Sequence, residues 1–451
     1  MPEPPVMPSA SSKPGTRYAW YVVGVLTLIY IFSFIDRQIL SLLVGPIRRD
    51  LHISDTGMSL LMGFTFAVFY TFFGIPLGRL ADSGNRRGII AAGFVAWSLF
   101  TAACGLVQSF WQMALMRMGV GIGEASLSPS AYSMISDYFP PQRRATAISV
   151  YSMGIYLGQG LAMVLGGLVL HFASRQEMWI LPVVGATRPW QLIFFAVGLP
   201  GVLCALLLLT VREPERREVR SHTATPFREV LRYMRLNSRT FLCHNFGISF
   251  IAMTAYGFAA WIPTLFIRIH GWTPAEAGLK IGLAVLLSGP AGIVCGGRLA
   301  DSLCSRGYRD ANMRVMFLAA ICWLPAAVAC TLAPTPALAL LLFLPSQFLM
   351  ASPFGAAPAA ITEIMPNEMR GQAAASYLFV NNLVGLGFGP TAIAILTDYV
   401  FRDETMLPYS MAVVATVALS IAALILRAGL RPFVGSLERL KLWNPAKVTG
   451  D

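Results

Sequence analysis

Two oppositely charged residues, Asp36 and Arg37, follow one another inside a long apolar segment at 18–45. The segment is long enough to cross a bilayer core of about 30 Å. A charge at such a depth costs about 2.5–3.5 kcal/mol on insertion scales, so intramembrane charges usually face a cavity and pair with each other. The pair therefore predicts a site that exchanges protons or binds a charged group.

A second charged pair, Arg117 and Glu124, lies in another apolar segment. A spacing of seven places both side chains on one face of a helix, and the three glycines between them allow close helix packing. We expect the partner to be the helix of Asp36 and Arg37, so that two acids and two bases form a neutral cluster. The alternative is a static network that braces the helices, although buried charges stabilise less well than apolar packing. For Arg117, a bracing role and a functional role are equally compatible with the sequence.

The composition indicates a membrane protein with many spans. Of 451 residues, 56% are hydrophobic and 12% are charged, and that charged share is about half the share in soluble proteins. The net charge of +12 comes from basic residues in short loops, a pattern that indicates membrane orientation and not nucleic-acid binding. The seven cysteines have no CxxC spacing, so we predict neither a disulfide framework nor a metal site.

Twelve apolar segments predict an all-α membrane protein with twelve transmembrane helices. A polar stretch divides them into two groups of six. The segments are 18–45, 57–79, 88–107, 110–137, 144–171, 189–210, 240–268, 276–299, 312–332, 336–364, 371–397 and 407–428. The expected domains are a disordered tail at 1–17, a first six-helix bundle at 18–210, a linker at 211–239, a second bundle at 240–430 and a tail at 431–451.

Arginines predict the orientation, because cytoplasmic loops carry an excess of them. Basic residues crowd the linker and the loops near 86, 143 and 306, whereas the opposite loops near 108 and 333 carry no charge. Both termini are therefore expected in the cytoplasm. Few acids on the outer side and no signal peptide predict the inner membrane of a bacterium.

The linker contains one predicted helix. Phe227, Val230, Leu231 and Met234 are spaced i, i+3, i+4 and i+7, with arginines on the other face. We expect this helix on the inner membrane surface, and a plain linker helix is the alternative. A second short surface helix is expected around 437–443.

An identical hexapeptide occurs twice, at 78–83 and at 297–302, at the ends of the second and eighth predicted helices. Each copy reads Gly-Arg-Leu-Ala-Asp-Ser and is followed by basic residues. Identical sequence at corresponding places in two groups of six helices indicates duplication, and parallel repeats build one transporter fold. Two pseudo-symmetric six-helix halves are therefore predicted.

The repeated motif resembles the signature loop of the major facilitator superfamily, and the resemblance covers residues from about 18 to 430. It implies that the glycines let helices approach closely and that the aspartates cap a neighbouring helix and pair with arginine as the halves move. A static loop brace is the alternative to this gating role. The residues concerned are Gly78, Asp82, Arg86, Gly297, Asp301 and Arg306.

Within that superfamily the charged helices are similar to the Spinster family. The similar elements are Asp36-Arg37 and the Gly-x-Gly-Glu-Ala-Ser sequence that contains Glu124. The resemblance implies that Asp36 and Glu124 couple transport to protons or switch conformation, and that Arg37 and Arg117 are their basic partners. It also implies transport of lysophospholipids or sphingosine 1-phosphate. Phe34 departs from the family pattern, and organic-anion carriers share the Asp-Arg pair, which weakens the substrate assignment.

Polar residues outside the cluster are fewer. Weaker cavity candidates are Ser128, Tyr256, Asn381 and Asn382. His244 lies near the cytoplasmic start of its helix, where we expect it to be solvated.

The leading hypothesis is a proton-coupled secondary transporter of an amphiphilic or anionic solute, working by alternating access. The second is an organic-anion or drug transporter with the same fold. A membrane enzyme is disfavoured, because the sequence contains no HExxH, P-loop or GxGxxG site, and no cofactor is predicted. We expect a monomer whose partners are its solute, protons and membrane lipid.

Overall fold

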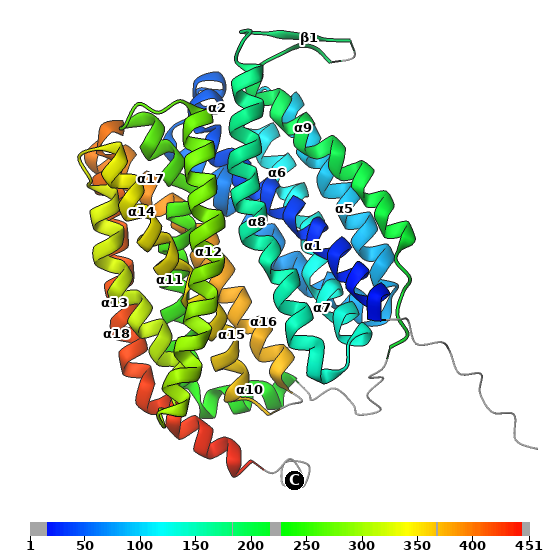
Figure 1. Ribbon diagram of the computed structural model, residues 1–451, viewed down its shortest axis with the longest axis vertical. Coiled ribbons are helices and arrows are strands. Elements are labelled where there is room, and N and C mark those ends of the chain that lie inside the picture. The colour runs from blue at the N-terminus through cyan, green and yellow to red at the C-terminus, as the bar shows by residue number, and fades with distance from the viewer. Residues whose placement is uncertain (1–15, 183, 217–226, 367–368, 444–451) are drawn as a thin grey trace, which may run out of the picture.

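The structure of the protein, a computed structural model, describes residues 16–182, 184–216, 227–366 and 369–443. The side chains of Asp82, Ser83, Pro141, Gln142, Ala145 and Phe227 also lie outside this description. Two helical bundles stand side by side along the long axis (Figure 1). We call the end that carries the small β-hairpin the hairpin end, and the end that carries α10 (Phe227–Leu236) the linker end.

The first half contains the long helices of six spans and several short helical turns. Its elements are α1 (Thr16–Gln38), η1 (Ile39–Leu42), α2 (Val44–Leu51), α3 (Asp55–Ser59), η2 (Leu60–Phe64), α4 (Thr65–Ser83), α5 (Arg86–Ala103), η3 (Cys104–Leu106), α6 (Phe110–Glu124), α7 (Leu127–Tyr138), α8 (Pro141–Ala173), α9 (Pro189–Cys204) and η4 (Ala205–Thr210). The antiparallel strands β1 (Trp179–Leu181) and β2 (Gly185–Thr187) join α8 to α9.

The second half repeats this order after α10. Its elements are α11 (Ser238–Arg268), α12 (Pro274–Ser305), α13 (Ala311–Thr331), α14 (Pro336–Ala351), α15 (Pro353–Glu363), α16 (Arg370–Val380), η6 (Asn381–Gly387), α17 (Phe388–Ile395), η7 (Leu396–Phe401), η8 (Glu404–Met406) and α18 (Leu407–Lys441). Short π-helical stretches occur at η2, η6 and η7. Such stretches free backbone carbonyls for other partners.

Eleven helical segments of the described chain are long and apolar enough to span a membrane. The one remaining predicted span, 110–137, is the fourth in chain order. It is broken into α6 and α7, which have 15 and 12 residues. The break falls at Ala125 and Ser126. Pro129 has no N–H to bond the carbonyl of Ala125, and the Ser126 hydroxyl donates to the carbonyl of Gly123 (2.8 Å). The two short helices together complete the twelve-helix fold.

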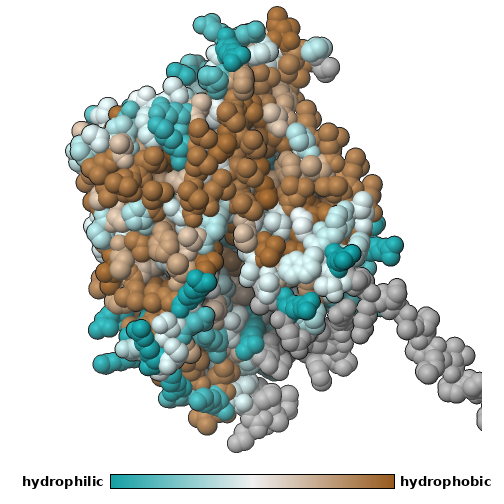
Figure 2. All heavy atoms as spheres, viewed as in Figure 1, coloured by the Kyte–Doolittle hydropathy of each residue, from teal (hydrophilic) through white to brown (hydrophobic). Residues whose placement is uncertain are grey.

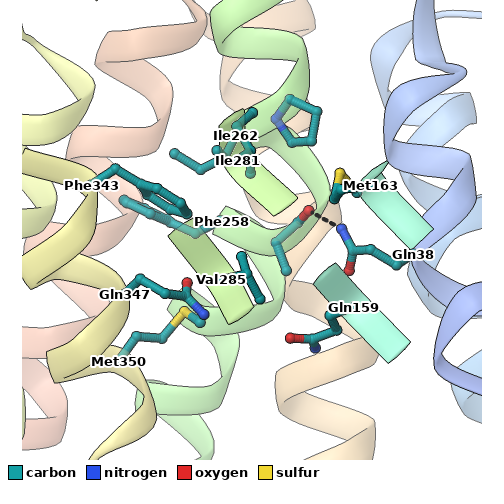
Figure 3. Close-up of a pocket in the computed structure, with 12 residues that line it drawn as sticks. Gln38, Gln159, Met163, Phe258, Ile262, Ile281, Val285, Phe343, Gln347 and Met350 are labelled. Atoms are coloured by element: carbon teal, nitrogen blue, oxygen red, sulfur yellow. Dashed lines mark hydrogen bonds between the residues drawn. The ribbon is translucent and has the colours of Figure 1, made fainter. Parts of the chain in front are cut away.

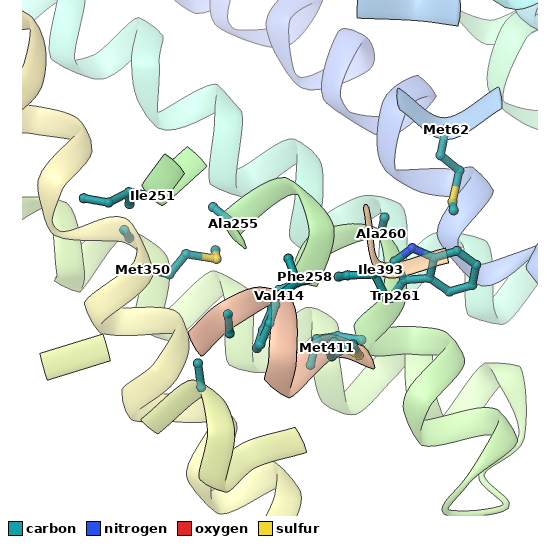
Figure 4. Packing of buried hydrophobic residues seen from close by; sticks show 14 of the residues in the cluster. Met62, Ile251, Ala255, Phe258, Ala260, Trp261, Met350, Ile393, Met411 and Val414 are labelled. Atoms are coloured by element: carbon teal, nitrogen blue, oxygen red, sulfur yellow. The ribbon is translucent and has the colours of Figure 1, made fainter. Parts of the chain in front are cut away.

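The two halves meet most closely toward the hairpin end. Helix α8 packs along α12, and α4 packs against η6. Glycines make this approach possible: a Cβ on Gly63 would lie 2.5 Å from the carbonyl oxygen of Leu386, and a Cβ on Gly278 would overlap the carbonyl oxygen of Met163. One apolar cluster crosses the interface, in which Met62 of the first half points toward Trp261 of the second (Figure 4).

Two predictions about the surface helices need correction. Helix α10 docks on the second half instead of presenting its apolar face to lipid, because Val230 and Tyr233 are buried and the Tyr233 hydroxyl donates to the carbonyl of Ile364 (2.7 Å). The separate helix expected at 437–443 is the end of α18, which continues to Lys441.

The surface supports a membrane location. Apolar side chains cover the flanks of both halves, and polar side chains gather at the two ends (Figure 2). Leucines with more than two thirds of their surface exposed are scattered over these flanks, at Leu203, Leu209, Leu287 and Leu424. The same view shows a recess between the halves in the part toward the linker end.

Candidate functional site

The centre of the predicted cluster is an ion pair between Arg37 and Glu124. Arg37 Nε and Nη2 each lie 2.7 Å from Oε2 of Glu124. Ser33, one helical turn before Arg37, donates its hydroxyl to the same oxygen (2.6 Å). Glu124 is fully buried, whereas the Arg37 side chain keeps 14% of its surface exposed. Arg37 is therefore the member of the ion pair that a solute could contact.

The local sequence explains how this pair forms. Arg37 lies in the last turn of α1, and Glu124 is the last residue of α6 before the break. The predicted close packing by glycine is confirmed: a Cβ on Gly121 would lie 2.8 Å from the carbonyl oxygen of Phe66, and one on Gly123 would lie 2.9 Å from Cβ of Trp97. The glycines thus pack α6 against α4 and α5, and the helix end carries Glu124 toward α1.

Aromatic rings surround the Arg37 guanidinium. Its central carbon lies 4.9 Å from the ring centre of Phe34, 4.6 Å from that of Phe66 and 4.7 Å from that of Tyr70. Each such contact contributes about 0.5–2 kcal/mol of attraction. Ser33, Phe66 and Tyr70 were not among the residues predicted from the sequence. The one available signal was the i, i+4 spacing of Phe66 and Tyr70, which lines one face of a helix.

Arg117 is buried beside the same Phe66 ring, 5.4 Å from its centre. Its Nε and Nη1 donate to the backbone carbonyls of Leu61 and Asp36, both at 3.4 Å. Leu61 lies in the π-helical η2, and Asp36 lies in the last turn of α1, where carbonyls lack helical partners. In the described residues Arg117 thus contacts backbone rather than a carboxylate, which favours a bracing role.

Several buried polar atoms in the cluster have no hydrogen bond with the described residues. They are Oδ1 of Asp36, Oε1 of Glu124 and Nη2 of Arg117. A buried polar atom without a partner costs about 1–3 kcal/mol, and natural structures keep few of them. A carboxyl group can lower this cost by taking up a proton, so Asp36 and Glu124 are suited to exchange protons.

Of the weaker candidates, Tyr256 lies near enough to Arg37 for an electrostatic interaction. Asn381 is buried at the start of η6, and its Oδ1 has no hydrogen bond with the described residues. Tyr256 packs against the apolar core of the first half, so it contributes to the contact between halves. Ser128 and Asn382 are half-buried, and within the described part of the chain neither hydrogen-bonds to Arg37 or Glu124.

The expectation for His244 was wrong. The side chain is fully buried, with Nε2 2.8 Å from the carbonyl oxygen of Ala357 and Nδ1 2.9 Å from Oδ1 of Asn245. Its ring also meets Tyr377 edge to face, at 5.5 Å between ring centres. Helix α11 begins at Ser238, so His244 lies almost two turns inside the bundle instead of at its end.

The repeated loop motif is only partly explained by the structure. A Cβ on Gly297 would meet nothing within 4 Å, and one on Gly78 would make ordinary contact with Pro129 at 3.9 Å. In this conformation neither glycine is needed for close helix packing, which corrects that expectation. Asp301 and Arg306 are exposed, and Asp82 lies outside the described side chains. The proposed motion of these loops stays a prediction.

Arg86 takes a defined structural place. It is buried and pairs with Asp137 at the end of α7 and with Glu213 of the linker, the latter at 2.7 Å. At the corresponding place in the second half, Asn312 donates to Glu363 (2.7 Å). The arginine therefore ties α5, α7 and the linker together at the linker end.

The hairpin end is closed by an ion network that was not predicted from the sequence. Arg268 of α11 donates to both carboxylate oxygens of Asp55 (2.7 and 2.9 Å). Arg48 contacts the same Asp55 (2.9 Å) and also Glu404 of η8 (2.7 Å). Because Arg48 and Asp55 belong to the first half and Arg268 and Glu404 to the second, these charges join the halves. Asp398 of the second half strengthens the closure, because its carboxylate accepts hydrogen bonds from the backbone N–H and the hydroxyl group of Thr56.

No group of three or more His, Cys, Asp or Glu side chains in the described residues is arranged to hold a metal ion. The site consists instead of an ion pair, an aromatic enclosure and unbonded carboxyl oxygens.

Comparison with known proteins gives a consistent result. The sequence profile of the Major Facilitator Superfamily matches residues 26–390. An "MFS-type efflux pump" of Mycolicibacterium smegmatis is 31% identical over 398 residues, which covers 87% of this chain and 88% of that protein. The human protein spinster homolog 1 is 26% identical over 409 residues, covering 85% of this chain and 74% of that protein.

A solved structure is also similar over its full length. The crystal structure of a bacterial homologue of the human lysosomal transporter Spinster, in an inward-facing and unoccupied conformation, has a TM-score of 0.76 with 27% sequence identity. The match covers 96% of this chain and 100% of that chain.

Proposed function

Because the chain belongs to the major facilitator superfamily of transporters, as a Spinster-like member, we propose that it moves an amphiphilic or anionic solute by proton-coupled alternating access. The lysophospholipids and sphingosine 1-phosphate are the proposed solute class. The observation that carries this proposal is the buried Arg37–Glu124 ion pair, with its partly exposed arginine. Such a pair joins one titratable group to one anion-binding group.

Proton coupling follows from competition for Arg37. While Glu124 is ionised, it accepts two contacts from Arg37 and one from Ser33. A proton on Glu124 removes the charge that holds Arg37, so the guanidinium becomes free to bind an anionic group of the solute. Asp36 is the second proposed proton acceptor, because its Oδ1 is buried without a hydrogen bond to the described residues. Binding of proton and solute then shifts the equilibrium between two conformations.

The charge distribution supports a location for each part of an amphiphile. The cluster of acids and bases lies in the first half, whereas α11 of the second half contributes mainly apolar side chains to the core, among them Ile251, Ala255 and Phe258 (Figure 4). The phosphate of a lysolipid would lie against Arg37, and its acyl chain would lie against the second half. Arg117 would brace the site from behind rather than contact the solute.

The orientation completes the proposal. Basic residues at the linker end predict that this end faces the cytoplasm, with both termini there, in a bacterial inner membrane. The ion network then closes the outer end, and the recess toward the linker end (Figure 2) corresponds to an inward-facing state. Transport requires this network to open while the linker end closes.

The test is uptake by proteoliposomes of a labelled lysophospholipid and of sphingosine 1-phosphate, with and without an imposed pH gradient. We expect the gradient to drive accumulation, and Glu124→Gln and Asp36→Asn to lose that drive. Glu276→Gln is the matched control, because Glu276 pairs with Lys280 at an exposed position. Gradient-independent transport by the wild type would indicate a facilitator, and folded protein that moves neither lipid would refute the lipid assignment.

Export of drugs or organic anions is the second candidate function. It is favoured by the relative that is called an efflux pump, which is similar to this chain over most of its length. An efflux pump for several compounds should lower the accumulation of chemically unrelated dyes in cells that express it. If the dyes are exported and lysolipid does not compete with them in proteoliposomes, drug export replaces lipid transport as the proposed function.

A further inference from the structure

A small cavity lies between the two halves. One of its lining residues, Gln38, directly follows Arg37 in the sequence, but neither Arg37 nor Glu124 lines the cavity. Its volume is ≈ 20 Å³, and a cavity of about 10–15 Å³ is enough for one water-sized group. Three glutamines from both halves lie around it, with apolar side chains between them (Figure 3). They are Gln38 of α1, Gln159 of α8 and Gln347 of α14. We call this cavity the amide pocket.

One wall of the amide pocket is a contact between the halves that depends on a proline. Pro263 of α11 has no N–H, so the carbonyl of Ala259, four residues earlier, has no helical partner. Gln38 Nε2 donates to this carbonyl across the interface (2.7 Å), and also to the hydroxyl of Ser41 (3.0 Å). Both amide hydrogens of Gln38 are thereby used, and its side-chain oxygen accepts no hydrogen bond from the described residues.

The opposite wall holds an amide without a partner. Gln347 has only 3% of its surface exposed, and its amide makes no hydrogen bond with the described residues. Figure 3 shows this amide pointing into the pocket, between Met350 and Val285. Burial of an amide without hydrogen bonds is unfavourable unless something binds it. Gln159, which lies between Gln38 and Gln347 around the cavity, likewise bonds to no described residue.

The chemistry of the lining indicates the kind of group that fits. A primary amide offers both donors and acceptors but carries no charge, and no charged side chain lines the pocket. A carboxylate or ammonium group would therefore lose hydration without gaining a counter-charge. A hydroxyl group is small enough, and it can donate to Gln38 while accepting from Gln347.

We propose that the amide pocket binds a hydroxyl group of the transported solute, so that the solute must carry a hydroxyl group near its anionic group. The proposal rests on the transport function proposed above and deepens it by specifying the solute. Gln38 directly follows Arg37, so the hydroxyl and the anion of one molecule would be bound by consecutive residues of α1. Because Gln347 comes from the second half, the bound hydroxyl would also connect the two halves.

The test compares solutes that differ by hydroxyl groups alone. The first pair is a lysophosphatidic acid and its 2-deoxy analogue, measured as initial uptake into proteoliposomes. The second pair is gluconate and hexanoate, measured by calorimetric binding to purified protein. We expect the wild type to prefer the hydroxylated member by about 5- to 100-fold, the range expected when a buried hydrogen-bonding group loses its partner.

Gln347→Leu should reduce this preference to less than about 2-fold, chiefly by weakening binding of the hydroxylated member. Gln347→Met serves as a second variant of similar volume in case the first folds poorly. Gln176→Ala, in the exposed segment before the hairpin, is the control and should keep the wild-type preference.

The outcomes separate this proposal from the proposed lipid transport. Lysolipid uptake without preference between the first pair would overturn the amide pocket while leaving lipid transport intact. A preference for gluconate without uptake of either lysolipid would support the pocket and refute the lipid assignment. A preference that Gln347→Leu leaves unchanged, or binding of neither hydroxylated probe, would overturn the pocket.

Discussion

Replacing Asp55 by asparagine should open the hairpin end. Asp55 is fully buried and takes three charged contacts at 2.7–2.9 Å from Arg48 and Arg268. Asparagine keeps the shape of the side chain but removes its charge. In the closed state the two arginines then keep their ion pairs with Glu404 but lose those with Asp55.

The size of the effect follows from these contacts. Breaking a buried ion pair costs about 3–5 kcal/mol. Here the cost is smaller, because the two arginines keep 15–17% of their side-chain surface exposed and retain Glu404. We therefore expect about 2 kcal/mol of destabilisation of the closed hairpin end. Since about 1.4 kcal/mol corresponds to a factor of ten, the ratio of open to closed molecules should rise about 30-fold.

The assay is pulsed electron–electron double resonance, which measures the distance between two spin labels, one placed at the hairpin end of each half. Gln108 and Ala337 are exposed at this end, and the seven native cysteines are replaced first. Asp55→Asn should add a population with a longer distance between the labels. Glu438→Gln, which breaks an exposed ion pair with Arg309 at the linker end, is the control. An unchanged distance distribution in Asp55→Asn, or an equal change in the control, would show that the network does not hold this end closed.

Three further substitutions have defined outcomes. Gly63→Ala should also favour an open hairpin end, because its Cβ would lie 2.5 Å from the carbonyl oxygen of Leu386; lower proteolytic protection of this end would confirm it, and wild-type protection would contradict it. Arg37→Lys should raise KM about 10-fold and leave the fold intact, because the lysine ammonium keeps the charge but lacks the planar two-nitrogen fork with which Arg37 contacts Glu124 and would bind an anion; an unchanged KM would contradict a solute contact. Arg86→Ala should lower the free energy of unfolding by about 3 kcal/mol, because it removes the buried guanidinium that pairs with both Asp137 and Glu213; unchanged thermal unfolding in detergent would count against this.

The sequence predicted the spans well, because a membrane imposes length and apolarity on every helix. Asp36, Arg37, Arg117 and Glu124 could be selected as candidates from the sequence, since charges in apolar segments are rare. The pairing was less predictable. A spacing of seven places Arg117 and Glu124 on one face of an ideal helix, but α6 ends at Glu124. Arg117 instead donates to the carbonyls of Leu61, in a π-helical stretch, and of Asp36, near a helix end.

Contacts between distant segments were the main omissions. Arg268 pairs with Asp55 from 213 residues away, and Glu404 pairs with Arg48 from 356 residues away. No local spacing relates these residues. The same holds for Gln38, whose acceptor exists because Pro263 interrupts α11. For His244, the position in the sequence suggested a helix end, whereas the true start of α11 lies almost two turns earlier.

The β-hairpin offers a practical handle for imaging. It is joined only to α8 and α9 of the first half, with the Trp179 ring donating to the carbonyl of Ala173 (2.8 Å). Ile180 is 86% exposed near its tip, and the hairpin projects beyond the helices (Figure 1). An antibody fragment raised against it would add mass to one half. Particle orientations in electron cryomicroscopy could then be assigned from that fragment, so that the movement of the second half relative to the first becomes directly visible.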